Sequence, residues 1–157
     1  MKLFKKIIAS LLVVLILLPI LFYVSVVVTN NYIANRIEKN LTSYELPEDT
    51  KLIDSFSKAE KLSGNGNGMQ YVGVILVESE LSAGAIKAHY SQKFDFIEVN
   101  EQKNEEIRFD LKIDRTFKGK IKDNGKTYYS VICWDDNRHD IFGDFISVLL
   151  DFDLRGH

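Results

Sequence analysis

The densest group of side chains that could do chemistry lies in the Asp135–Asp144 loop. Asp135, Asp136, His139 and Asp140 fall within six residues of one another. Carboxylate oxygens and imidazole nitrogens are ligands that proteins offer to divalent cations. The spacing does not match a calcium-binding EF-hand, because Asp140 occupies the sixth position, where that loop needs glycine. Asp and Asn also make the backbone hydrogen bonds of ordinary loops. We prefer the ordinary loop and keep these four residues as candidate metal ligands.

Other motifs resemble catalytic or phosphate-binding motifs only in part. The glycine-rich run 64–68 opens a predicted strand and lacks the Lys-Ser/Thr of a P-loop, so we expect a hairpin turn. Residues 55–58 match Ser-x-x-Lys without its companion motifs. No two of the histidines His89, His139 and His157 have metal-ligand spacing. The sequence therefore predicts no catalytic residue and no cofactor, and an enzyme is the less favoured interpretation.

Cys133 is the only cysteine in the chain. An intramolecular disulfide and a four-cysteine zinc site are therefore both excluded. Cys133 lies in the apolar run 131–134, with no obvious base or cation nearby to activate a thiol. We expect it to be a small buried apolar residue.

The charge of the chain is unevenly distributed. The first 30 residues contain three lysines and no acidic residue, so the remainder carries 17 basic and 22 acidic residues, a net charge of −5. A domain of that sign gains no counterion-release energy on nucleic acid, and anionic lipid headgroups repel it. We therefore expect no nucleic-acid partner.

Residues Ile7 to Val28 form a 22-residue stretch without a charge, of which 17 are Leu, Ile, Val or Phe. A helix of this length spans about 33 Å, which matches a hydrocarbon core of about 30 Å. Pro19 lies near the middle, where a membrane helix tolerates a kink. The sequence predicts a transmembrane helix, with membrane lipid as the partner of residues 7–28.

A cleaved signal peptide is the alternative interpretation of this stretch. Its apolar region is usually about 7–15 residues long and ends at a small-x-small cleavage site, whereas this run is longer and has no such site. Lys2, Lys5 and Lys6 crowd the N-terminal end, and the next basic residue is Arg36. This asymmetry favours a cytoplasmic N-terminus and an extracellular C-terminal domain. We expect an uncleaved, single-pass signal-anchor in the cell membrane.

The residues beyond the first 30 suffice for one domain. Ile33, Ile37 and Leu41 recur at helical spacing and predict an amphipathic extension of the anchor helix. The sequence therefore divides into three parts: the cytoplasmic tip and signal-anchor (1–30), a juxtamembrane helix and linker (31–48), and an extracytoplasmic domain (49–157).

Hydrophobic patterning predicts several strands and one helix in that domain. The strands are expected at 51–62, 69–78, 94–100, 107–113 and 127–134. The second is almost continuously apolar and should be a central strand covered on both faces. Ser79 or Ser82 can cap a helix that runs to about Lys93, with Ile86 and Tyr90 facing the sheet.

The end of the chain fits two patterns. Apolar residues within 141–154 recur at helical spacing, and many also alternate as in a strand. We favour the strand because β-branched and aromatic residues are frequent there. The predicted fold class is α+β: an N-terminal transmembrane helix, then one antiparallel sheet of about five to six strands with one packed helix.

Four stretches of the sequence are similar to those of one group of proteins: 46–50 (LPEDT), 64–71 (GNGNGMQY), the Ser82–Tyr90 helix and 153–157 (DLRGH). On these stretches the chain resembles short, uncharacterised single-pass envelope proteins of Gram-positive bacteria, over most of the external domain. The resemblance implies a membrane-tethered external domain and brings no catalytic residues with it.

The predicted location and fold favour a non-enzymatic binding or interaction module that acts on another envelope protein. The alternative is a ligand- or metal-binding receptor, or an envelope hydrolase, that uses the Asp135–Asp144 loop. The first interpretation requires a protein partner at the outer membrane face. The second requires chemistry from the four candidate ligands.

Overall fold

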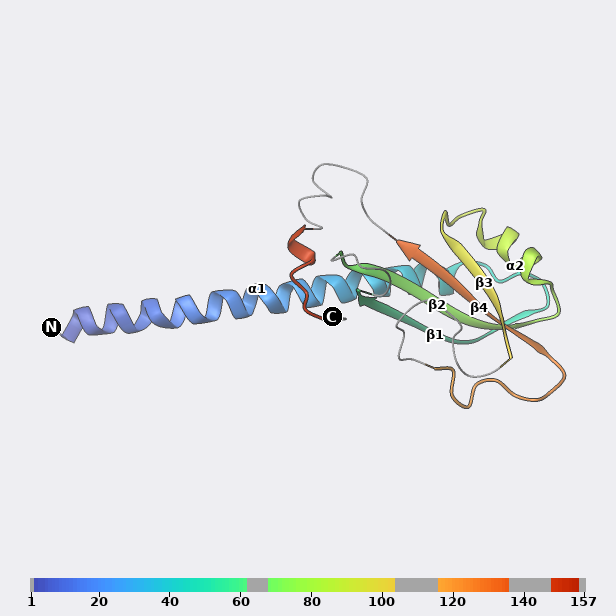
Figure 1. The fold of residues 1–157 in the computed structure, drawn as a ribbon, viewed down its shortest axis with the longest axis horizontal. Coiled ribbons are helices and arrows are strands. Elements are labelled where there is room, and N and C mark those ends of the chain that lie inside the picture. The colour runs from blue at the N-terminus through green and yellow to red at the C-terminus, as the bar shows by residue number, and fades with distance from the viewer. Residues whose placement is uncertain (1, 62–67, 104–115, 136–147, 156–157) are drawn as a thin grey trace.

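The computed structural model describes residues 2–61, 68–103, 116–135 and 148–155 (Figure 1). The element order is α1 (Lys2–Ser43), β1 (Thr50–Glu60), β2 (Gln70–Ser79), α2 (Ala83–Tyr90), β3 (Ile97–Gln102) and β4 (Thr127–Asp135). The strands form one sheet in the order β1-β2-β4-β3, and each neighbouring pair is antiparallel. The α+β class is confirmed, but within these described ranges the sheet has four strands rather than the five to six expected.

Of the five strands predicted between residues 51 and 134, four correspond to strands of this sheet, and 107–113 lies outside the described residues. β2 is central, and Tyr71–Val77 are all buried, which confirms a strand covered on both faces. β3 begins at Ile97, later than predicted. Phe94 still belongs to the turn after α2, where its backbone N–H donates to the carbonyl of Tyr90.

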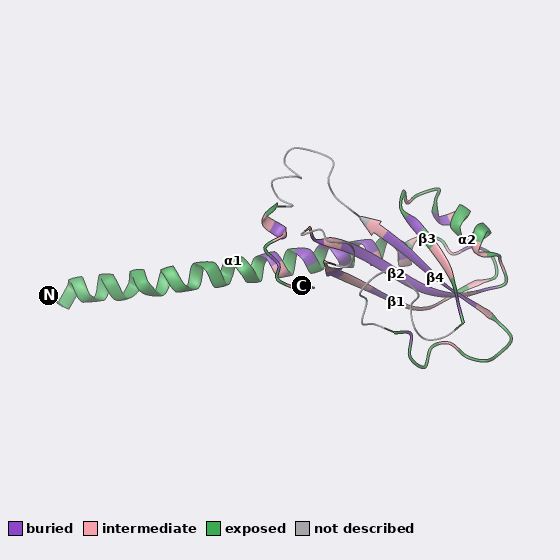
Figure 2. Ribbon diagram, in the orientation of Figure 1, coloured by how far each residue is buried: buried purple, intermediate pink, exposed green. Residues whose placement is uncertain are grey.

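The two halves of α1 have different surroundings. The large apolar side chains from Leu3 to Val24 are exposed, whereas Ile33, Ile37 and Leu41 are buried against the domain (Figure 2). The first half is long and apolar enough to cross a membrane, although a signal sequence has the same character. The predicted helical extension is confirmed, and its apolar side is part of the domain core. One unbroken helix therefore joins the exposed apolar segment to the folded domain.

Both faces of the sheet are covered, because alternate residues of each strand point to opposite faces. Ile75 and Val131 face the side that contacts α1 and α2, where Cys133 is also buried as predicted. Val74 and Ile132 face the other side and pack with Phe117, which follows β3 in the chain.

Gly73 of β2 lies directly beneath α1. A Cβ atom at this position would lie 2.7 Å from the backbone nitrogen of Glu38 and 2.9 Å from Cγ2 of Ile37. Real Cβ atoms essentially never come that close to a neighbouring heavy atom. The helix therefore approaches the sheet to a distance that only glycine permits at this position.

Of the two predicted caps of α2, Ser79 and Ser82, the structure shows Ser82. The hydroxyl of Ser82 accepts a hydrogen bond from the backbone N–H of Ala85 at 3.3 Å. Ile86 and Tyr90 are fully buried, as their spacing predicted. The helix ends at Tyr90, and residues 91–93 continue as a turn rather than as the last turn of the helix.

The preferred strand at the end of the chain is wrong for the part that the structure describes. Residues 148–150 are helical and 151–152 form a turn, while 141–147 lie outside the described residues. The segment lies beside α1 (Figure 1). Its helical turn directs Leu150 into the core and leaves Val148 exposed, which satisfies the apolar pattern with a helix instead of a strand.

Candidate functional site

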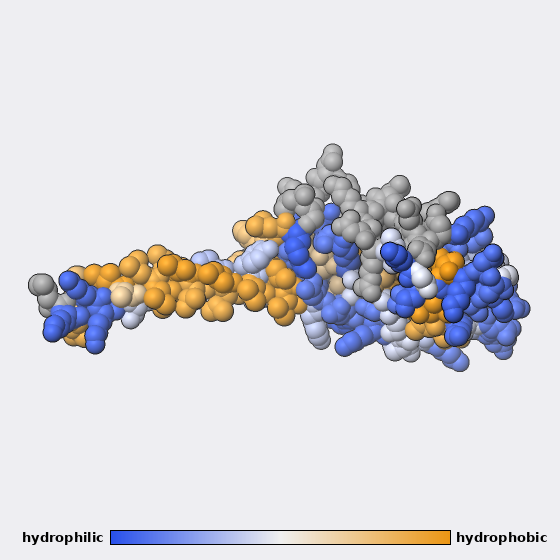
Figure 3. Space-filling model, turned by 90° about the horizontal axis from the view of Figure 1, so that it is seen from below, coloured by the Kyte–Doolittle hydropathy of each residue, from blue (hydrophilic) through white to orange (hydrophobic). Residues whose placement is uncertain are grey.

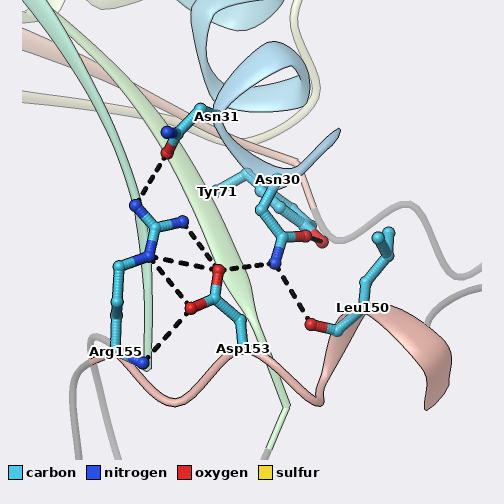
Figure 4. Close-up of polar contacts among 6 residues, drawn as sticks. All are labelled: Asn30, Asn31, Tyr71, Leu150, Asp153 and Arg155. Atoms are coloured by element: carbon cyan, nitrogen blue, oxygen red, sulfur yellow. Dashed lines mark hydrogen bonds and ion pairs between the residues drawn. The ribbon is translucent and has the colours of Figure 1, made fainter. Parts of the chain in front are cut away.

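A buried group of hydrogen bonds joins the end of the chain to α1 and β2, and we call it the Asn30 network: Asn30, Tyr71, Asp153 and Arg155 (Figure 4). Nδ2 of Asn30 donates to the carbonyl of Leu150 at 3.1 Å and to Oδ2 of Asp153 at 2.9 Å. The hydroxyl of Tyr71 donates to Oδ1 of Asn30 at 2.8 Å. Asn30 therefore connects α1, β2 and the C-terminal residues 150–153.

Arg155 is the partly exposed member of the network and binds both Asp153 and α1. Its Nη2 donates to Oδ2 of Asp153 at 2.7 Å, and its Nε donates to Oδ1 at 2.9 Å. Its Nη1 donates to Oδ1 of Asn31 at 2.8 Å. A guanidinium that binds a carboxylate through two nitrogens is the strong form of an ion pair. Arg155 thus holds the end of the chain on α1.

The carboxyl group of Asp153 is fully buried and forms an ion pair with Arg155. Burial alone raises the pKa of a carboxyl group, but the hydrogen bonds from Arg155 and Asn30 outweigh it and hold the pKa of Asp153 below its usual value. The hydrogen bond to Asp153 raises the pKa of Arg155. The network is therefore an ion pair with its polar atoms bonded to each other, which suits a structural clasp better than a ligand site.

A second polar group lies at the opposite end of the sheet, and we call it the distal cluster: Glu78, Asn124 and Tyr128. Glu78 and Tyr128 are paired across β2 and β4, and the Tyr128 hydroxyl donates to Oε2 of Glu78 at 3.0 Å. Nδ2 of Asn124 donates to the same hydroxyl at 3.2 Å. Two depressions of about 460 and 510 Å³ flank Tyr128. They are of a size that accommodates a few side chains of a partner.

Charges of both signs line these depressions. Lys122 borders both, Lys51 borders one, and Asp123 borders the other. Close by, Nζ of Lys126 forms an exposed ion pair with Glu80 at 2.9 Å. This pairing raises the pKa of Lys126 and lowers the pKa of Glu80. A mixed-charge, partly hollow surface is typical of the polar rim of a protein interface.

Two buried tyrosines offer a matched test of the Asn30 network. Tyr71→Phe removes the donor to Asn30 and leaves a buried amide oxygen without that bond, so we expect a loss of about 1–2 kcal/mol of unfolding free energy. The Tyr90 hydroxyl is buried and has no hydrogen-bond partner among the described residues. Tyr90→Phe should therefore leave stability unchanged or raise it. Urea unfolding of the full chain in detergent measures both, and equal losses would contradict the network.

The stability that depends on Tyr90 should also change in alkali. Burial, with a smaller contribution from Tyr44, raises the pKa of Tyr90 to about 12 from an ordinary value of 10. The fold therefore favours the neutral phenol. This contribution to stability is complete below pH 10 and is lost as the pH rises toward 12. Unfolding curves across this range should show a smaller alkaline loss for Tyr90→Phe than for the unsubstituted chain.

The structure separates the residues that the sequence singled out. Lys2, Lys5 and Lys6 lie exposed at the free end of α1. The marker residues of the predicted span are also exposed on α1: Ile7, Pro19 and Val28. Their arrangement suits a lipid-facing helix with a basic end.

Of the four candidate metal ligands, only the backbone of Asp135 is among the residues that the structure describes. The backbone of Asp135 pairs with Tyr71 at the end of β4. Asp136, His139 and Asp140 lie outside the described residues, as does most of the glycine-rich run. Within the described ranges, no group of three or more His, Cys, Asp or Glu side chains could hold a metal ion.

The sequence analysis did not predict the Asn30 network, although the position of Asn30 in α1 could have indicated it. Asn30 lies three residues before Ile33 and is therefore in phase with the buried stripe of α1. A polar residue in an apolar stripe indicates a buried hydrogen-bonding partner. Nothing local to Asp153 or Arg155 pointed to that partner.

Comparison of the chain with protein-family models, with curated proteins and with solved structures finds no match.

Proposed function

We propose that this protein is a membrane-tethered, extracytoplasmic binding module that acts on another envelope protein. The apolar half of α1 serves as a permanent signal-anchor, with Lys2, Lys5 and Lys6 at its cytoplasmic end. We place it in the cell envelope of a Gram-positive bacterium, which is the setting that the resemblance of stretches such as 46–50 and 64–71 implies. The domain is then presented outside the membrane.

One observation carries this proposal: α1 continues without a break from its exposed apolar half into the domain core. Val26 and Asn30 lie within the first 30 residues and are almost completely buried, on the same helix whose residues up to Val24 are exposed, and Val26 is part of the domain core. A removable leader would not be expected to supply part of the core of the mature domain. This continuity therefore favours a retained anchor over a cleaved signal peptide.

The distal cluster is the surface that we assign to the partner. β2 runs from Gln70, beside the end of the chain, to Ser79, so Glu78 lies at the end of the sheet away from the apolar half of α1 (Figure 1). A partner embedded in the same membrane reaches this surface with an external domain. The depressions on either side of Tyr128 would take its polar and charged side chains.

Photocrosslinking in the native membrane tests the proposal. A photoreactive amino acid at Lys122 or Asp123, both exposed beside the distal cluster, should join the full chain to a membrane or envelope protein of fixed size. The matched control is Gln92, which is equally exposed in the turn after α2, on the other face of the sheet. Adducts identical at all three positions, or none at the first two, would contradict the assigned surface. A cytoplasmic protein as the sole partner would contradict the orientation.

A further inference from the structure

Three large apolar side chains are exposed in the C-terminal segment, residues 148–155: Val148 (59% exposed), Phe152 (56%) and Leu154 (66%). Single exposed apolar residues are common on proteins, but these three fall within seven residues. Figure 3 shows apolar side chains at the base of the domain that continue the apolar surface of α1. They form one surface with the helix rather than a separate patch.

A ring contact gives the position of this segment along α1. The rings of Phe22 and Phe152 pack edge to face with their centroids 6.0 Å apart. Phe22 lies 15 residues after Ile7, which is about 22 Å along the helix. If Ile7 marks the inner boundary of a hydrocarbon core about 30 Å thick, Phe22 lies inside that core. Phe152 touches it and therefore lies at the same depth.

The polar groups of the segment contact a part of α1 that lies further from the N-terminus than Phe22. Asp153 and Arg155 bind Asn30 and Asn31 of α1. Asn31 lies 24 residues after Ile7, about 36 Å along the helix and beyond the hydrocarbon core. The segment thus has an apolar side at the level of the lipid chains and a polar side at the level of the headgroups. This is the arrangement of an interfacial membrane element.

Resting on the proposed anchor, we infer that the C-terminal segment is a second membrane contact: Val148, Phe152 and Leu154 lie in the acyl chains of the outer leaflet. The occupant is lipid because this surface is continuous with the apolar half of α1. The Asn30 network holds the segment at that depth. Val26, which is inside the predicted span but only 4% exposed, is then covered by the protein instead of by lipid.

Depth measurements on the full chain in phosphatidylcholine–phosphatidylglycerol vesicles test this inference. Single cysteines are introduced in a Cys133→Ala background as Phe152→Cys, Leu154→Cys, Leu15→Cys and Phe96→Cys, and each is labelled with nitrobenzoxadiazole. Quenching by lipids with a nitroxide on the acyl chain then reports depth. Phe96 is the matched control because it is an equally exposed aromatic residue (53%) outside this segment.

The position of the control follows from the register of the sheet. Ile97, next to Phe96, pairs with Cys133, and Cys133 pairs with Gly73, which lies against Glu38 of α1. Glu38 is 16 residues beyond Phe22, about 24 Å further from the membrane. A label at position 96 should therefore be in water.

Labels at positions 152 and 154 should be quenched about as strongly as the label at position 15, and several-fold more strongly than the label at position 96. Equal, weak quenching at 152, 154 and 96, with strong quenching at 15, would overturn the second contact and leave the anchor in place. A blue-shifted but unquenched label at 152 would show a protein occupant and would also overturn it. Weak quenching at position 15 would overturn the anchor itself, and this inference with it.

Discussion

Gly73→Ala is expected to destabilise the domain by about 3 kcal/mol, the upper end of what an added methyl group costs in a tightly packed core. The new Cβ would lie 2.7 Å from the backbone nitrogen of Glu38. A flexible side chain could move aside, but here the obstacle is the backbone of a helix. Either α1 must lift from β2 or the sheet must bend. Both responses separate Ile37 from the strands beneath it.

Urea unfolding of the full chain in detergent micelles, followed by the fluorescence of Trp134, measures this loss. Gly84→Ala is the matched control, because a Cβ there meets only Oγ of Ser82, at 3.9 Å. Gly84 lies in α2, where alanine should be neutral or stabilising by at most about 1 kcal/mol. If both variants unfold at the same urea concentration, α1 does not rest on β2 as described.

Asp153→Ala is expected to cost about 2–4 kcal/mol, because it removes the acceptor at the centre of the Asn30 network. Arg155 then loses its carboxylate, and the Asn30 amide loses one of its two acceptors. The C-terminal segment should detach from α1, so a protease should cleave it faster than in the unsubstituted chain. Unfolding in urea and limited proteolysis report the two effects separately.

Glu80→Ala is the control for this substitution. It also breaks an ion pair, with Lys126, but on the exposed surface. Exposed pairs contribute little to stability, so neither the unfolding midpoint nor the proteolysis should change. A similar loss in both variants would show that burial of the Asn30 network is not what makes it important.

The contribution of the Asn30 network to the free energy of unfolding should decrease in acid. The fold holds the pKa of Asp153 below its usual value of 3.8, so the ionised carboxylate stabilises the fold above that pH. As the pH falls further and the folded protein takes up this proton, the contribution is lost. Asp153→Asn already lacks the charge and should show a smaller acid-induced loss than the unsubstituted chain.

Local patterns in the sequence predicted much of this fold. The uninterrupted apolar run identified β2, the i, i+4, i+8 spacing of Ile33, Ile37 and Leu41 identified the buried side of α1, and Ser82 marked the start of α2. These features depend on neighbours in the chain. The prediction for residues 148–152 was wrong because apolar residues there fit both periods, and the choice depends on contacts with α1 more than 100 residues earlier.

The polar sites were harder to predict for the same reason. Hydrogen bonds of the Asn30 network join residues up to 123 positions apart, from Asn30 to Asp153. In the distal cluster, Glu78 meets Tyr128 only because β2 and β4 are neighbours in the sheet. Gly73 gave no warning either, since a glycine in a strand looks the same in sequence whether or not a helix crosses it. Contacts between residues so far apart in the chain cannot be predicted from a local stretch of sequence.

The unbroken course of α1 has a mechanical consequence. If α1 is the proposed anchor, there is no joint between its apolar half and the domain core, so any tilt that the bilayer imposes on the helix is also a tilt of the sheet. Membrane helices commonly tilt by about 20°, which moves a point above the surface sideways by roughly a third of its height. A thinner or thicker bilayer would therefore shift where the distal cluster stands relative to a neighbouring protein. The lateral position of the distal cluster would therefore depend on the thickness of the membrane.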